Sequence, residues 1–109
     1  MRRTREGMLL RIFIGDSDRH EGKPLHHALV ERARAQGLAG ATVLHGPMGF
    51  GRHSRLHTAK LLELSSDLPV VIEIVDAEEA IERFMVEVDR MVGEGLVTLE
   101  KVRIIELGP

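Results

Sequence analysis

The chain of 109 residues is 43% hydrophobic, which is enough for one core but too short for two ordinary domains. Its 15 Lys and Arg against 17 Asp and Glu give a net charge of -2, so the overall balance attracts neither nucleic acid nor an anionic membrane. The absence of cysteine excludes disulfides and thiolate metal sites and fits a reducing cytoplasm. Three Phe without Tyr or Trp leave almost no stacking platform for single-stranded nucleic acid. We therefore expect one cytoplasmic domain over residues 1–109 that does not bind nucleic acid.

The first half of the chain predicts a strand, a helix and a second strand. We expect the basic residues 1–7 to be disordered. The apolar, β-branched run at 8–14 alternates and is expected to form a strand, and it is too short to span a bilayer. A helix is expected from Pro24, which suits a first turn, to Gly37, which stops it. Residues 41–45 read as the second strand.

A Gly-rich and His-rich stretch at 46–58 follows, and we expect it to be a flexible loop. The run at 59–64 fits either a helix or a strand, and the turn residues after it favour a strand. Residues 70–75, with three valines and two isoleucines, are the clearest strand in the chain.

The last third predicts a helix and a strand. Asp76 followed by Glu79 resembles a capping box, which starts a helix by accepting hydrogen bonds from unpaired backbone N–H groups. Apolar residues then recur at helical spacing until Gly93 or Gly95, and the final strand covers about 97–106.

This order predicts an α+β, ferredoxin-like βαββαβ fold, with an antiparallel sheet and both helices on one face. Alternation along the strands places further apolar side chains on the other face, which the helices leave open. We expect that face to meet another subunit. Its predicted members are Leu9, Phe13, Val71, Val75 and Ile105.

A segment without Asp or Glu runs from Arg32 to Leu62. Cationic side chains next to unhindered glycine N–H groups suit a phosphate, so this segment is a candidate anion site. The alternative is a solvated basic loop in which the glycines only make turns. The candidate residues are Arg32, Arg34, Arg52, Arg55, Lys60, His45, His53, His57, Gly46, Gly49 and Gly51.

Two other kinds of chemistry are weaker readings of the same sequence. His45, His53 and His57 could ligate a transition metal, although a Gly-rich loop does not favour helical spacing of the last two. Polar residues 16–20, including Asp16, are better explained by local turn hydrogen bonds than by acid-base catalysis. No catalytic signature stands out, so we expect no enzyme and no dedicated metal site.

Several motifs resemble the PII-like signalling superfamily over about the whole domain. They are GATV at 40–43, GFGR at 49–52, HT at 57–58 and LPVVIEIVD at 68–76. More narrowly, three further segments resemble an uncharacterised branch of that superfamily: IFIGDSD at 12–18, GKPL at 22–25 and HTAKLLELS at 57–65.

The resemblance implies a homotrimer that holds adenine nucleotides in clefts between neighbouring subunits and has a loop that changes shape on binding. Gly49, Gly51 and Arg52 match the family's loop-base motif near the phosphates, and Thr42 resembles its adenine-side threonine. His53 stands where typical members have the glutamine that helps to hold the magnesium of bound ATP, which puts ATP-magnesium sensing in question.

Other departures concern the loops. Thr42 is one residue farther from GFGR than in typical members, and the loop is shorter and lacks the modifiable tyrosine, so uridylylation is not expected. In the second phosphate-binding loop Gly93 and Gly95 remain but a lysine is lost, and Lys101 and Arg103 are candidate substitutes.

The leading hypothesis is a trimeric regulatory protein that binds an adenine nucleotide or a similar small anion and reports it through the 46–58 loop. The resemblance implies a membrane transporter or channel, such as a fluoride channel, as partner. The alternative is a trimer that binds a divalent metal or a metabolite, similar to copper-tolerance proteins of the same fold. An enzyme on this sheet is the third reading.

Overall fold

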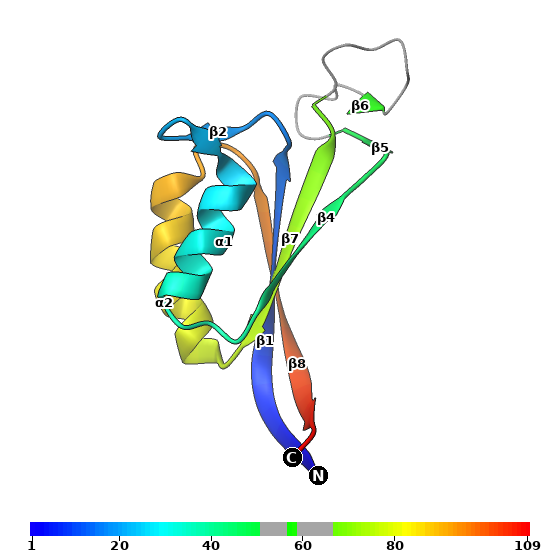
Figure 1. The fold of residues 1–109 in the computed structure, drawn as a ribbon, viewed down its shortest axis with the longest axis vertical. Coiled ribbons are helices and arrows are strands. Elements are labelled where there is room, and N and C mark those ends of the chain that lie inside the picture. Colours follow the sequence, from blue (N-terminus) through cyan, green and yellow to red (C-terminus); the bar gives the residue numbers. More distant parts are fainter. Residues whose placement is uncertain (51–56, 59–66) are drawn as a thin grey trace.

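The computed structural model describes residues 1–50, 57–58 and 67–109, with side chains for the first and last of these ranges. Its main sheet is antiparallel, in the order β4-β7-β1-β8. Both helices lie on the same face of this sheet, as Figure 1 shows. The α+β, ferredoxin-like arrangement expected from the sequence is therefore confirmed. The elements are β1 (Arg2–Gly15), α1 (Leu25–Ala35), β4 (Ala41–His45), β7 (Pro69–Asp76), α2 (Glu78–Met91) and β8 (Leu96–Leu107).

Short strand pairs extend the loops at one end of the sheet. β2 (Arg19–His20) pairs with β3 (Lys23–Pro24) just before α1. β5 (Met48–Gly49) pairs with β6 (His57–Thr58) beyond the end of β4 (Figure 1). The strand expected at 59–64 lies outside the described residues, and so does the middle of the loop expected at 46–58.

The core lies between the helices and the sheet and follows the alternation along each strand. On β1, Leu10 and Ile12 are fully buried, whereas Arg11 between them is only half-buried. At roughly 25 cal/mol for each square ångström of apolar surface, burial of this set is the main stabilising contribution to the fold. The set is completed by Ile14, Leu25, Ala28, Leu29, Ala33, Val70, Ile72, Ile74, Ile81, Phe84, Val88 and Met91.

Helix α1 ends as its sequence predicts. Gly37 adopts a φ of 77°, which a residue with a side chain rarely takes. The N–H of Gly37 donates to the carbonyl of Arg34, and that of Leu38 donates to the carbonyl of Ala33, which is a Schellman motif. Pro24 occupies the N-cap position just before α1, one residue ahead of the expected first turn.

Helix α2 starts where expected, but the capping box is wrong. Ala77 is the N-cap, so Asp76 precedes the cap and does not cap the helix with its side chain. The Asp76 carboxylate instead accepts hydrogen bonds from the N–H of Ala77 at 2.7 Å, from the N–H of Ala39 at 3.0 Å and from Arg5 at 3.4 Å. These donors come from three parts of the chain, so Asp76 ties β1, β7 and the segment before β4 together.

Two further expectations differ from the structure. Residues 1–7 are not disordered, because Arg2–Gly7 pair with β8 in a ribbon that extends past the helices (Figure 1). Ile105 is not on the open face, because it pairs with Thr4 and so shares the side of Leu10. Alternation within each strand could not reveal this, since the relation between strands depends on their register.

Candidate functional site

The open face of the sheet carries an apolar row next to a charged row. Leu44, Val71, Phe13 and Leu96 stand side by side across β4, β7, β1 and β8. Leu44 and Leu96 are 50% and 56% exposed, respectively, although their neighbours in the row are half-buried. Side chains of this kind in a row across four strands form an apolar surface that nothing in the described chain covers.

The charged row lies next to the apolar row and centres on Arg11. Its guanidinium donates to Glu73 at 2.8 Å and to Glu100 at 3.3 Å. The hydrogen bond that Arg11 donates to Glu73 is the main reason why the pKa of Arg11 lies above its usual value. Thr42 on β4 is exposed and faces the same side, since it pairs with Glu73.

The predicted ligand-binding residues of the first half lie along β4 and β5. Thr42 is in the edge strand β4, and Gly49 is in β5 at the base of the predicted loop. At Gly49 a Cβ atom would come within 2.9 Å of Pro69, so the strand packs too closely for a side chain. The other predicted loop residues, Gly51, Arg52, His53 and Arg55, lie outside the described residues.

The predicted residues of the second half lie on the opposite edge. Gly93 and Gly95 lie between α2 and β8 in a shallow depression that also contains the acidic Asp89. Gly95 packs against β1, where a Cβ atom would be 3.0 Å from the carbonyl oxygen of Phe13. The cations that could bind a phosphate are farther along the edge strand β8, at Lys101 and Arg103, and both are exposed.

The described part of one chain does not bring these two sets together. β4 and β8 are the two edges of the sheet, and three strand spacings separate them by about 14 Å. Thr42 faces the open side, whereas Lys101 pairs with Met8 and therefore faces the side that carries the helices.

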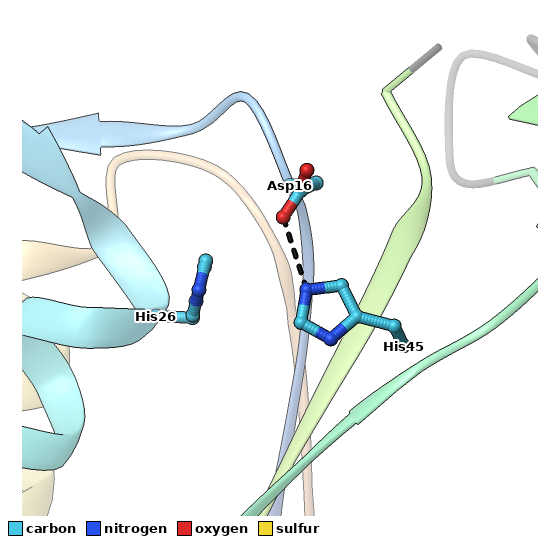
Figure 2. Close-up of side chains that lie close together, drawn as sticks. All are labelled: Asp16, His26 and His45. Atoms are coloured by element: carbon cyan, nitrogen blue, oxygen red, sulfur yellow. Dashed lines mark hydrogen bonds and ion pairs between the residues drawn. The ribbon is translucent and has the colours of Figure 1, made fainter.

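A different cluster forms where β1 and β4 end, and the sequence analysis did not predict it. Figure 2 shows Asp16 after β1, His26 in the first turn of α1 and His45 at the end of β4. His45 Nε2 lies 3.1 Å from Asp16 Oδ1, and the rings of His26 and His45 meet edge to face at 5.4 Å. One potential ligand atom from each residue lies within 4.8 Å of the others.

The backbone holds this cluster firmly. The N–H of Asp16 donates to the carbonyl of Leu68 at 2.8 Å, and His45 pairs with Val70. Leu25, which precedes His26, is 3% exposed and packs the first turn of α1 into the core. Three separate elements therefore present their side chains to one point.

Histidine ionisation in the cluster follows from burial. Burial lowers the pKa of His26, the charges of His45 and His27 lower it further, and Asp16 opposes them. The neutral imidazole, which has a lone pair to offer, is therefore favoured near neutral pH.

The sequence analysis did not identify His26 and assigned Asp16 and His45 to other roles. Asp16 was read as a turn residue, and His45 was grouped with His53 and His57, whose side chains lie outside the described residues. The cluster joins residues 29 positions apart, Asp16 and His45, and only the sheet register reveals that. The sequence signal that could have pointed to His26 was a histidine in the first turn of α1, two residues after a proline.

The comparisons with known proteins agree with this fold. The structure is similar to that of CPII, a nitrogen regulatory PII-like protein from Thiomonas intermedia K12 bound to ADP, AMP and bicarbonate. The TM-score is 0.63 at 16% identity, covering 94% of this chain and 91% of that one. It is also similar to a Bacillus subtilis GlnK–ATP complex, with a TM-score of 0.55 at 14% identity, covering 89% and 82% of the two chains. The chain therefore has the PII-like fold.

The sequence identifies the branch. Residues 7–104 match the model of DUF190, a family described as uncharacterised, and the chain belongs to that family. It is 46% identical over 99 residues to a UPF0166 protein of Aquifex aeolicus, covering 91% of this chain and 93% of the relative. The resemblance is thus confirmed at two levels, since the fold is PII-like and the family is an uncharacterised one. Among the described residues, no helix is long and apolar enough to cross a membrane.

Proposed function

We propose that the chain is a cytoplasmic regulatory protein that assembles as a homotrimer and binds an adenine nucleotide, or a similar small anion, in clefts between subunits. Binding orders the loop at 46–58, which contacts a partner such as a membrane transporter or channel. The protein catalyses no reaction in this role. The ligand acts only through its higher affinity for the ordered state of the loop.

The observation that carries this proposal is the separation of the predicted binding residues. Thr42 and Gly49 belong to one edge of the sheet, and Lys101 and Arg103 belong to the other. A second copy that brings its β8 edge against the β4 edge of the first would complete a site that one chain leaves divided. Lys101 and Arg103 are both exposed on β8, so an anion can reach both cations.

The open sheet face supports the trimer. An apolar row over four strands, with two leucines half exposed, is costly in water and is stabilised when a neighbour covers it. The fold neighbours support a nucleotide as the ligand, since CPII is bound to ADP and AMP and the GlnK structure is an ATP complex.

The assembly is tested with a matched pair of charge substitutions. Leu44→Glu puts a carboxylate on the open face, whereas Val86→Glu puts one on α2 at a side chain that is 65% exposed. Native mass spectrometry and sedimentation should give a trimer for wild type and Val86→Glu and a smaller species for Leu44→Glu. A monomeric wild type, or the same mass for all three proteins, would refute the intersubunit cleft.

The ligand is tested by calorimetry with ATP, ADP, AMP and cyclic nucleotides, with and without magnesium. Lys101→Ala combined with Arg103→Ala, and separately Arg52→Ala, should weaken binding by about tenfold or more, because each removes a charge-assisted contact. Arg83→Ala on the exposed side of α2 is the control and should bind like wild type. If no nucleotide binds to a trimer, the ligand class is wrong while the assembly stands.

A further inference from the structure

We propose that Asp16, His26 and His45 form a binding site for a divalent transition-metal cation within each subunit. The site uses none of the residues assigned to the nucleotide, and one chain supplies all of its side chains. It therefore goes beyond the proposed function and does not depend on the trimer.

The geometry is close to that of a metal centre. Ligand atoms around a tetrahedral zinc ion, bonded at 2.0–2.2 Å, lie about 3.3 Å from one another. Asp16 Oδ1 and His45 Nε2 are already 3.1 Å apart. With all three ligand atoms within 4.8 Å, the His26 ring needs to approach by at most about 1.5 Å to complete the set.

An unpaired nitrogen supports the same conclusion. His26 Nδ1 is buried, and no group in the described part of the chain forms a hydrogen bond with it. A buried polar atom without a partner costs free energy, and native proteins rarely leave one so. A metal ion bonded to Nδ1 would give this buried atom a partner.

The donor set selects the class of cation. Two imidazoles and one carboxylate suit zinc, iron, cobalt, nickel or copper, whereas calcium and magnesium prefer oxygen ligands. Three protein ligands leave coordination positions open for water or a small anion. Two of the three residues are half-buried and His45 is exposed, so the ion can enter from solvent.

The cluster lies at the base of the loop expected at 46–58. Next to His45, the N–H of Gly46 donates to the carbonyl of Pro69, and the chain then enters the loop expected at 46–58. A bound cation would tie the first turn of α1 to the end of β4 at the base of that loop.

The test uses the tag-free protein without nucleotide. Zinc affinity is measured by competition with a chromophoric chelator, and cobalt absorption spectra report the ligand set. Wild type should bind one ion per chain. Asp16→Asn, His26→Ala and His45→Ala should each weaken zinc binding by about tenfold or more, since even outer partners of metal ligands are worth 10–100-fold.

Two controls separate this site from other histidines. His27→Ala removes the exposed histidine next to His26 and should leave affinity unchanged. The double variant His53→Ala with His57→Ala should also bind like wild type. Failure to bind zinc, an equal loss in His27→Ala, or a loss confined to the double variant would overturn the proposal. Because Asp16→Asn preserves shape, it decides the question even if a histidine variant does not fold.

Discussion

The two faces of the main sheet are made by the same strands and differ in what covers them. On the helix side, Ile72 is fully buried against the helices. On the other side, its neighbour Val71 stands in a row whose outer members, Leu44 and Leu96, remain half exposed. One face is completed by its own chain, and the other has the composition of an interface.

The polar groups of the two faces differ in the same way. Asp76, on the helix side, is surrounded by backbone and guanidinium donors from its own chain and is 13% exposed. Arg11, on the open side, binds Glu73 and Glu100 but stays 38% exposed. The difference indicates that the first group holds the subunit together, whereas the second remains accessible from solvent.

The largest expected effect is a difference in stability between substitutions on the two faces of the sheet. Ile72→Ala should lower the free energy of unfolding by about 2–5 kcal/mol, because it leaves a cavity in the core. Val71→Ala, one residue away, should cost about 1 kcal/mol or less in the isolated subunit. Urea denaturation measures both.

Protein concentration sharpens this result. The loss in Ile72→Ala should be the same at all concentrations, whereas the loss in Val71→Ala should grow where subunits associate, because binding to the folded state adds to stability. Equal and concentration-independent losses would contradict the distinction between the faces.

Asp76→Asn should have the next largest effect. Asn keeps one acceptor oxygen. Either the N–H of Ala39 at Oδ2 loses its partner, or the N–H of Ala77 and the guanidinium of Arg5, which share Oδ1, lose theirs. Loss of such a buried partner costs about 1–3 kcal/mol. Thermal unfolding should show this loss, and Asp89→Asn on the exposed side of α2 should melt like wild type.

The same residue predicts a pH dependence. Burial raises the pKa of Asp76, but the N–H groups of Ala77 and Ala39 and the charge of Arg5 together bring it below 3.8. The unfolded chain therefore takes up the proton first as the pH falls. The stability from Asp76 is complete above 3.8 and is lost as the pH falls through the lower folded value. Asp76→Asn should flatten this part of the acid unfolding curve.

Local patterns were enough to predict the elements whose signals repeat along the chain. The strand at 41–45 and the stop at Gly37 match the structure, and the helices lie where apolar spacing put them. Residues 1–7 were misread because their order depends on β8, which lies about a hundred positions away. Asp76 was misread because its donors come from tertiary contacts rather than from its own helix.

The candidate sites were less predictable because they depend on register. Thr42 and Lys101 were correctly noticed as polar residues on strands, but only the order β4-β7-β1-β8 shows that they lie on opposite edges. His26 looked like an ordinary helix residue until the fold placed it beside Asp16 and His45. Residue type can identify a candidate ligand, but the pairing of distant strands determines which candidates lie close together.

The smallest expected effect comes from the charged row of the open face. Glu100→Gln removes the longer of the two ion pairs of Arg11, and Glu31→Gln removes the exposed ion pair between α1 and Lys23 on the helix side. An exposed pair contributes little and is screened by salt, whereas a covered pair is screened much less. At concentrations where subunits associate, the small loss of thermal stability in Glu100→Gln should therefore persist at high salt, while that in Glu31→Gln should vanish. If salt removes both losses equally, Arg11 faces water in the assembly and the open face is not the interface.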